Sequence, residues 1–415
     1  MNNLILLFLL SSCAFFISKI DSEIIKEKNY LKNIPLTPTY CPMEQKPHLQ
    51  LVNSNSKSQE IFTEFISKHP NYNFVDRLIF WALIQMSLRP DQSSPSSRLQ
   101  LIISLNNSPL YIDFFSESDE HQYPFLYGLE WISQRFKGKK LEFYAQILDT
   151  ELAQKLRVEK GLEVFLEKNK EKIKQDKILG PFFIRGTEIL KEGERVPQIK
   201  YTQLIKFYRK FGPQQKIIIN TALNKFAMNG GQTIHSNYDF NLYQNSIFLI
   251  DQEMPISNIF GLATHEDVFM ASTTQNVHQI NPIDSLPLFY GSSKVRSSAF
   301  CFIQNQKDFI WLVSNMGRDP GQHLFHLIKY GMASAEKIED VDRLMRHSRY
   351  IFLSDPVRLI IESHRSRSDQ IENLLKLTLP IYNADKLGNI WSYSSLNETG
   401  RFIIDDRNLG SFSCK

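Results

Sequence analysis

Short stretches of alternating hydrophobic and polar residues predict several β-strands in this chain. Residues 99–105 alternate in this way, the turn residues 106–109 follow, and residues 110–115 (LYIDFF) resume the extended pattern. This succession predicts a β-hairpin. In the second half of the chain, residues 261–272 (GLATHEDVFMAS) and 299–315 (AFCFIQNQKDFIWLVSN) each predict two strands around a polar turn.

Longer amphipathic or apolar runs with capping residues predict helices between these strands. The run 73–88 (NFVDRLIFWALIQMSL) starts at Asn73, an N-cap residue with Asp76 three positions on, and stops before Pro90. A second helix is predicted to begin at Asp319. A proline follows this N-cap residue, and a glycine ends the helix. The run 151–177 mixes Glu and Lys at helical spacing, which predicts a long helix with a solvated face.

The chain of 415 residues exceeds one comfortable hydrophobic core, so two domains are expected. From Lys19 to about Ser58 the chain is polar and supplies Pro and Ser without periodicity, which indicates that residues 14–58 form a tether. Residues 59–211 predict a small N-terminal α+β domain of helices and a hairpin. The segment GPQQ, which begins at residue 212, marks the boundary between the domains. Residues 212–415 predict a mixed α+β domain with mainly antiparallel sheet and added helices.

The N-terminus begins MNNLILLFLLSSCAFFISK, and its apolar run has the length of a secretory signal rather than a membrane span. Residues 10–13 (LSSC) resemble the lipobox of bacterial lipoproteins, in which the cysteine, here Cys13, is acylated. We prefer this interpretation, with a signal peptide at 1–13 and a lipid anchor in a membrane. Ordinary signal cleavage with secretion and an uncleaved anchor running to Ile17 are the alternatives.

Apart from Cys13, three cysteines remain. Cys41 and Cys414 lie near the two ends of the chain, and a bridge between them is plausible in an oxidising compartment. Cys301 lies in an apolar run and is expected to be a buried small hydrophobe rather than a nucleophile. Two glycosylation sequons, at Asn106 (N-N-S) and Asn397 (N-E-T), would matter only in a eukaryotic secretory route.

Composition and motifs exclude several classes of function. The net charge of +4 is small and scattered, without a basic stripe interleaved with aromatic residues, so a nucleic-acid partner is not expected. The chain has no GxSxG, HExxH, P-loop, GxGxxG or CxxC motif. His323 and His326 lie three apart on the helix that Asp319 caps, but without a third ligand motif they are read as packing residues. No metal or cofactor is therefore expected.

Several pieces between residues 216 and 331 occur in an order that resembles the phosphodiester glycosidase family. They are AMNGG, SIFLIDQEMPISN, FGLATHEDVFMAS, QINPIDSLPLFYG, RSSAFCFIQNQKDFIWLVSN and GQHLFHLIKYG. By this resemblance, Asn229, Gly230 and Gly231 match the family's asparagine-glycine motif, and Arg296 matches its Arg-led strand. The chain departs from the pattern because the closing Asp-Gly-Gly is absent.

The resemblance implies an enzyme that hydrolyses sugar phosphodiesters or related envelope glycans. Arg296 would bind the phosphate, and the glycines would let the backbone approach the ligand. Asp239, His235 or Asp385 would carry protons. Each residue also has a structural interpretation, as a turn, a surface charge or a cap. The alternative hypothesis is a non-catalytic binding or scaffold lipoprotein of the cell envelope that has lost the site.

Overall fold

The computed structural model describes most of the chain from residue 38 to residue 414. The segments within this span that it does not describe are 43–47, 54–55, 107, 119–121, 153, 197–198, 212–214, 229–231, 246–255, 276–281, 284–285, 290, 292, 306–307, 316–318, 355–356, 367, 377–379 and 408–409. The chain forms two compact units, each assembled from separate stretches. Unit 1 takes residues from 1–42, 223–254 and 299–408, and unit 2 takes residues from 43–222, 255–298 and 409–415. These units interleave along the chain, so they do not follow the expected order of 59–211 and then 212–415.

Unit 2 is built on a seven-stranded sheet in which every pair of neighbouring strands is antiparallel. In spatial order its strands are β20 (Ser411–Cys414), β1 (Gln50–Asn53), β9 (Ile256–Ala263), β10 (Val268–Gln275), β2 (Arg98–Leu105), β3 (Ser108–Phe115) and β6 (Ile218–Asn220). Only the pairs β9–β10 and β2–β3 are hairpins of neighbouring strands. The sheet therefore joins segments that are far apart in the sequence.

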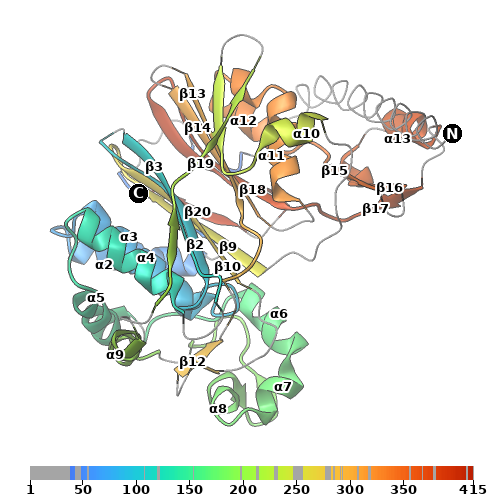
Figure 1. Cartoon of the computed structure of the whole chain (residues 1–415). Coiled ribbons are helices and arrows are strands. Elements are labelled where there is room, and N and C mark those ends of the chain that lie inside the picture. Colours follow the sequence, from blue (N-terminus) through green and yellow to red (C-terminus); the bar gives the residue numbers. More distant parts are fainter. Residues whose placement is uncertain are drawn as a thin grey trace. The chain divides into compact units, whose positions relative to one another are not determined.

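Three helices of unit 2, α2, α3 and α4, lie side by side on one face of this sheet (Figure 1). Alternate residues of the strands, such as Leu99, Leu101 and Ile103, join the large core under these helices. The helices of the whole unit are α2 (Ser56–Lys68), α3 (Phe74–Leu88), α4 (Pro124–Arg135), α5 (Leu141–Ile147), the π-helix η1 (Leu148–Leu152), α6 (Lys160–Lys168), α7 (Lys170–Gln175), α8 (Leu179–Phe183) and α9 (Tyr201–Phe211). Two short ribbons complete the unit, β4 (Ile184–Arg185) with β5 (Glu188–Ile189) and β11 (Pro282–Ile283) with β12 (Leu286–Phe289).

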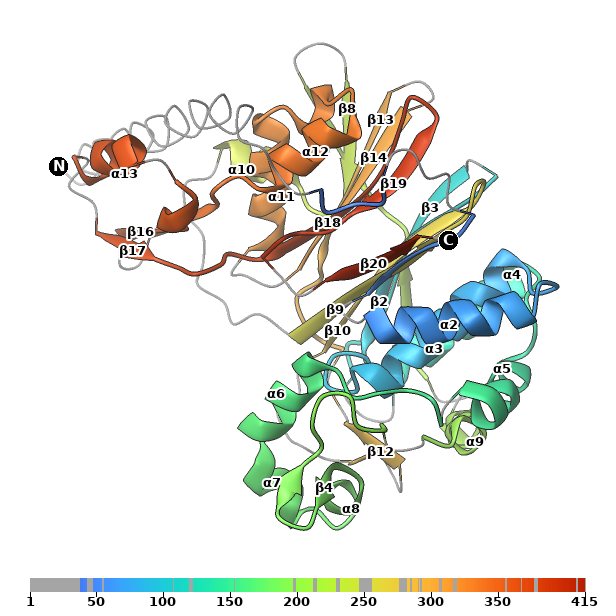
Figure 2. The same cartoon turned by 180° about the vertical axis from the view of Figure 1, so that it is seen from behind.

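Unit 1 has a six-stranded antiparallel sheet with α11 and α12 packed against it (Figure 2). Its strands in spatial order are β19 (Thr399–Ile403), β18 (Asn389–Leu396), β14 (Asp308–Asn315), β13 (Ala299–Asn305), β8 (Thr233–Ser236) and β7 (Asn224–Ala227). A smaller sheet holds β15 (Tyr350–Ser354), β16 (Val357–Ile361) and β17 (Ile381–Asn383). The helical segments are α10 (Phe240–Asn245), α11 (Pro320–Lys329), η3 (Met332–Ser334), α12 (Ile338–Met345), η4 (Ser363–Arg365) and α13 (Ser368–Leu375).

Helices and mainly antiparallel sheets confirm the expected α+β class. The hairpins expected from residues 99–115, 261–272 and 299–315 are all present. The Asn73 side chain accepts a hydrogen bond from the Asp76 N–H, and Asp76 accepts one in return, so the capping box is also confirmed.

The long helix expected over residues 151–177 is wrong. Residues after η1 leave the helical conformation, and helices resume only as the short α6 and α7. The reason is a tertiary contact, because the Val158 N–H donates to the Glu194 carbonyl (2.8 Å) and Val158 accepts from the Gly193 N–H (3.0 Å). These bonds hold the segment extended against its local helical preference.

Cysteine states follow the expectations in part. Cys301 is fully buried and free, and burial raises the pKa of its thiol. Cys41 and Cys414 each take part in a disulfide. Cys13 lies outside the described residues. Within the described residues, no helix combines the length and the apolar character that crossing a membrane requires.

Candidate functional site

The second face of the unit 2 sheet carries buried polar side chains near one end of its central strands. The strand registers place these residues in two adjacent rows. The first row holds Ser257 on β9, Thr274 on β10 and Arg98 on β2, and the second holds Ser272 on β10, Gln100 on β2 and Asp113 on β3. All six alternate with residues of the helix-covered face, such as Leu99 and Phe114, so they share the opposite face.

Ser257 and Thr274 are the most unusual members of this cluster. They are direct cross-strand partners, which places their Cβ atoms about 5 Å apart. Ser257 is 2% and Thr274 is 1% exposed, and neither hydroxyl has a hydrogen-bond partner among the described residues. A buried hydroxyl without a partner costs about 1–3 kcal/mol, and such groups in folded proteins require an explanation such as catalysis or a bound molecule.

Arg98 and Asp113 add a charged pair beside these hydroxyls. The guanidinium donates two hydrogen bonds to the carboxylate, from Nε (2.8 Å) and from Nη2 (2.5 Å). It also lies 4.5 Å from the ring centroid of Phe115, a cation–π contact. Burial raises the pKa of the Asp113 carboxyl, and the Arg98 hydrogen bonds act against that rise.

Residues at both ends of the segment 291–298 are hydrogen-bonded to the polar cluster or beside it. The Arg98 Nη1 donates to the Val295 carbonyl (2.8 Å), and the Gly291 N–H donates to Ser96 Oγ (3.1 Å). At its end, Ser298 Oγ lies 2.8 Å from Ser272 Oγ. These bonds fix the segment beside the two rows.

Both the oxygen and the nitrogen of the Gln100 side-chain amide are hydrogen-bonded to Ser298, the last residue of this segment. Its Oε1 accepts the Ser298 N–H (2.8 Å), and its Nε2 donates to the Ser298 carbonyl (3.3 Å) and to the Tyr111 hydroxyl (2.9 Å). The Tyr111 hydroxyl in turn lies 3.5 Å from Asp113 Oδ2. The cluster is therefore a continuous polar network next to two hydroxyls that it leaves unbonded.

This arrangement suits chemistry at a hydroxyl. Serine and threonine hydroxyls serve as nucleophiles when a base is nearby, and a fixed polar network can hold such a group in place. No group of three or more His, Cys, Asp or Glu residues suited to a metal occurs within the described part of the chain.

The residues that the sequence nominated for catalysis lie elsewhere, in unit 1. His235 is on β8, and burial followed by the nearby Lys225 lowers the pKa of its imidazole. Asp239 Oδ1 accepts from the Asn241 N–H (3.0 Å) and from its amide (2.9 Å), which is the role of a turn residue. Asp385 is exposed after β17. No described hydrogen bond or ion pair joins the three nominated residues.

The resemblance also nominates four residues for substrate binding. Arg296 belongs to unit 2, two positions before Ser298 in the segment described above. Asn229, Gly230 and Gly231, which the resemblance assigns to substrate binding, lie outside the described residues. The expected sugar phosphodiester site stays a prediction.

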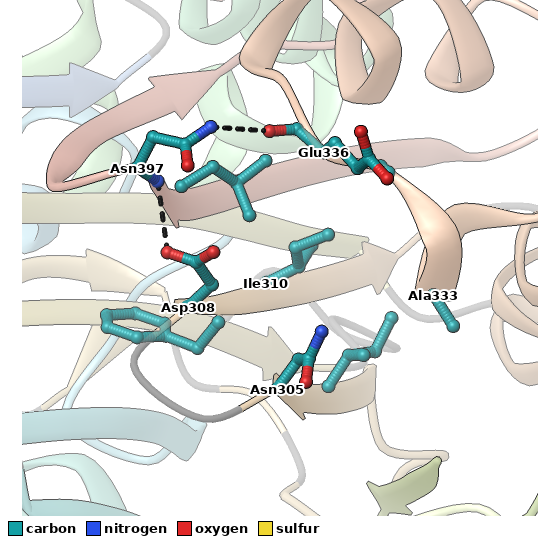
Figure 3. A pocket seen from close by; sticks show the side chains of 10 residues that line it. Asn305, Asp308, Ile310, Ala333, Glu336 and Asn397 are labelled. Atoms are coloured by element: carbon teal, nitrogen blue, oxygen red, sulfur yellow. Dashed lines mark hydrogen bonds between the residues drawn. The ribbon is translucent and has the colours of Figure 1, made fainter. Parts of the chain in front are cut away.

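Unit 1 contains a small pocket of about 160 Å³ at the turn between β13 and β14 (Figure 3). Asp308 accepts the Asn397 N–H (3.0 Å), and the Asn397 side chain donates to the Glu336 carbonyl (3.1 Å). Its apolar wall includes Ile310 and Ala333. Its lining residues include the carboxylates Asp308 and Glu336 but no serine, threonine, cysteine or histidine, so the pocket does not offer a hydroxyl or thiol nucleophile.

Unit 1 also contains a buried network of charges in which each carboxylate is paired with a guanidinium. Arg407 pairs with Glu362 (2.6 Å) and with Asp405 (3.2 Å), and Arg349 pairs with Asp405 (2.7 Å). Burial, followed by the positive charge of Arg407, lowers the pKa of Arg349 to about 10. We interpret this network as structural, because each carboxylate is held by at least one guanidinium.

Comparisons with known proteins define the fold and not the family. No family model matches the chain, and no curated protein matches it in sequence. Two solved structures of LmbA2991 match with a TM-score of 0.61 at 8% and 7% identity, each over 92% of this chain and 100% of the other. A cephalosporin acylase from Bacillus halodurans matches with a TM-score of 0.55 at 10% identity, over 92% of this chain and 98% of the other. The chain therefore has the fold of these proteins, one of which is an acylase.

Sequence reasoning missed Ser257, Thr274, Gln100 and Ser298, although one signal for them was available. The expected strand that ends at Ser272 continues with two threonines, so hydroxyl residues occupy positions that the hydrophobic pattern predicts to be buried. Extending the hairpin 261–272 by its own register pairs Ser257 with Thr274.

Proposed function

We propose that this protein is an acyl-transfer hydrolase in which Ser257 is the nucleophile. The observation that carries the proposal is the pair of buried, unbonded hydroxyls of Ser257 and Thr274 beside the network of Arg98, Gln100 and Asp113. The shared fold with an acylase supports the reaction class, because an acylase cleaves an acyl bond. The substrate is then an amide or ester of a carboxylic acid.

The proposed reaction has two steps. The Ser257 oxygen attacks the carbonyl carbon, the bond to the leaving amine or alcohol breaks, and an acyl-serine ester forms. Water then attacks this ester and releases the carboxylic acid, which regenerates the serine. We assign to Thr274, the cross-strand partner of Ser257, the role of orienting the Ser257 oxygen during the reaction.

A serine hydroxyl needs a base that accepts its proton. Enzymes supply this base from a neighbouring side chain or from the nucleophile's own N-terminal amine. Ser257 has no hydrogen-bonded partner among the described residues, so no described side chain serves as its base. We therefore assign the role to the α-amine of Ser257, which becomes free only when the chain is cut between Ile256 and Ser257.

Hydrolysis of N-acyl p-nitroanilides tests the proposed function. A panel with short, long, neutral and acidic acyl groups is incubated with the full chain, and release of p-nitroaniline is followed. Ser257→Ala should abolish the activity. Ser104→Ala is the matched control, since Ser104 is a buried serine on the same face of β2, about 20 Å along the strand from Arg98. Equal activity of the Ser257→Ala variant and the unaltered protein would refute the assignment.

A non-catalytic binding protein is the second candidate function. It is favoured by the position of Ser257 inside a continuous strand without a described base. In that case the chain stays intact, and the polar cluster holds a ligand without changing it. The p-nitroanilide panel separates the two candidates only if cleavage of the chain is measured in the same preparations.

Three expectations from the sequence remain proposals of their own. They are export through the N-terminal segment, a lipid on Cys13, and activity on sugar phosphodiesters or envelope glycans. The acyl-transfer proposal depends on none of them. We rank the sugar phosphodiester substrate below acyl substrates, because the Asp239 carboxylate already accepts two hydrogen bonds within its own turn.

A further inference from the structure

The sequence has two N-x-S/T sequons, and the structure places their asparagines at equivalent positions in two different hairpins. Asn106 follows Leu105 at the end of β2, and Leu105 pairs with Ser108 at the start of β3. Asn397 follows Leu396 at the end of β18, and Leu396 pairs with Thr399 at the start of β19. Each asparagine is therefore the first residue of a two-residue hairpin loop.

Turn chemistry explains the two asparagines but not the sequons. A two-residue loop of this type favours Asn with a positive φ at its first position, and Asn106 and Asn397 both have φ of 51°. The same turn favours glycine at the second position, whereas Glu398 occupies it with φ of 61°. Ser108 and Thr399 supply a hydroxyl at the third position of both hairpins. Thr399 Oγ1 donates one long hydrogen bond within its turn, to the Asn397 carbonyl (3.5 Å), which does not account for the hydroxyl of Ser108.

Both acceptor side chains are accessible. Asn106 and Asn397 are exposed in their turns. The Asn106 backbone N–H donates to Asp267 Oδ1 (3.1 Å), which fixes the turn through its backbone rather than through the acceptor amide. The Asn397 amide nitrogen donates one hydrogen bond, to the Glu336 carbonyl (3.1 Å), and a nitrogen that carries a sugar keeps one N–H for this bond.

We propose that Asn106 and Asn397 are N-glycosylation sites, with the lower occupancy at Asn106, because Pro109 directly follows its sequon and disfavours transfer to it. In each case the bond forms between the amide nitrogen and the first sugar of an oligosaccharide on a lipid pyrophosphate donor, and the pyrophosphate leaves. Two further features agree with an oxidising secretory compartment, the apolar N-terminal run and the disulfides of Cys41 and Cys414. The proposal selects ordinary secretion over the lipid anchor at Cys13.

The test uses the full chain with its own N-terminal segment, expressed in a eukaryotic secreting cell line, and the unaltered protein isolated from the cells that make it naturally. Peptide N-glycosidase should increase the mobility of both preparations and convert Asn106 and Asn397 to aspartate in peptide mass spectra. Ser108→Ala and Thr399→Ala should each remove one of the two shifts in electrophoretic mobility that the glycosidase causes. Ser108→Thr and Thr399→Ser should keep both shifts. The Thr and Ser variants also control for misfolding, since they preserve a hydroxyl at each strand start.

Resistance of the naturally produced protein to the glycosidase would overturn the proposal, and a diacylglycerol on Cys13 in that preparation would do the same. Conversion at only one asparagine would overturn the assignment of the other. A second shift that persists in Ser108→Ala or Thr399→Ala would show that the sugar is attached elsewhere.

Discussion

Ser257 and Thr274 face each other across β9 and β10 in the interior of unit 2, and neither hydroxyl has a hydrogen-bond partner among the described residues. Their neighbours in the same cluster, Ser272 and Ser298, are hydrogen-bonded to each other. The sheet thus satisfies one pair of hydroxyls and leaves the adjacent pair available. This contrast is the basis for assigning chemistry to Ser257.

The first prediction concerns the continuity of the chain. If the α-amine of Ser257 is the base, the active protein is cut between Ile256 and Ser257. Mass spectrometry of the purified protein should then find one chain that begins at Ser257. We assign the cut to the chain itself: the Ser257 hydroxyl attacks the Ile256 carbonyl carbon, the peptide bond breaks to give an ester and the free α-amine, and water hydrolyses the ester to leave a carboxylate on Ile256. Ser257→Ala should therefore stay uncut, and Ser257→Thr should be cut, because threonine keeps the hydroxyl. An active preparation made only of uncut chains would contradict the assignment of the base.

A second prediction separates a functional from a structural role for Thr274. Thr274→Val replaces an unbonded buried hydroxyl by a methyl group of similar size, so the stability should be unchanged or slightly higher. The rate constant kcat should fall about tenfold, which corresponds to ~1.4 kcal/mol of lost orientation energy. Thr274→Ser should keep most of the activity. A loss of stability in Thr274→Val without a loss of kcat would indicate packing alone.

The hairpins of this protein were predictable from the sequence because the information for them is local. The alternation in residues 99–105 and the turn at 264–267 specify β2 and the β9–β10 connection through neighbouring residues. The order of the strands in the sheet was not predictable, since β1 pairs with β9 more than two hundred residues away, as in Gln50 with Ala263.

The site was missed for the same physical reason. Its members come from residues 98–113, 257–274 and 298, and only the sheet brings these segments together. Each of them reads as an ordinary polar residue in a strand when taken alone. The sequence nominated Asp239 because it lies near glycines and a histidine, but its carboxylate serves the turn before α10.

The third prediction concerns the ion pair of Arg98 and Asp113. Asp113→Ala leaves a buried guanidinium without its carboxylate, so it should lower the free energy of unfolding by about 3–5 kcal/mol. Changing both partners, as Arg98→Met with Asp113→Leu, should cost less than Asp113→Ala alone. Denaturant titration measures both values. A loss below about 1 kcal/mol for Asp113→Ala would mean that the pair is accessible to water.

The fourth prediction concerns His323, which is 1% exposed and whose two ring nitrogens have no hydrogen-bond partner among the described residues. Burial, followed by the charge of Arg349, lowers the pKa of His323 well below 6.5. The unfolded chain therefore binds a proton that the native state does not, so the stability falls as the pH drops below about 6.5. The loss is at most ~1.4 kcal/mol per pH unit for one group.

His323→Leu should remove this part of the pH dependence. The decrease in Tm between pH 7 and pH 5 should be smaller in this variant than in the unaltered protein. His265→Gln is the control, because His265 is exposed at the turn between β9 and β10 and should leave the decrease unchanged. The same decrease in His323→Leu and in the unaltered protein would contradict a neutral buried imidazole.

The most direct measurement of the central claim is the site at which an acyl group becomes attached. The protein is mixed briefly with p-nitrophenyl acetate, quenched in acid and digested, and the acetylated peptide is located by mass spectrometry. The proposed function predicts an acetyl group on the hydroxyl of Ser257, with no such adduct at that position in Ser257→Ala and an unchanged adduct in Ser104→Ala. Acetylation confined to surface lysines, or an adduct on Ser298 in place of Ser257, would contradict it.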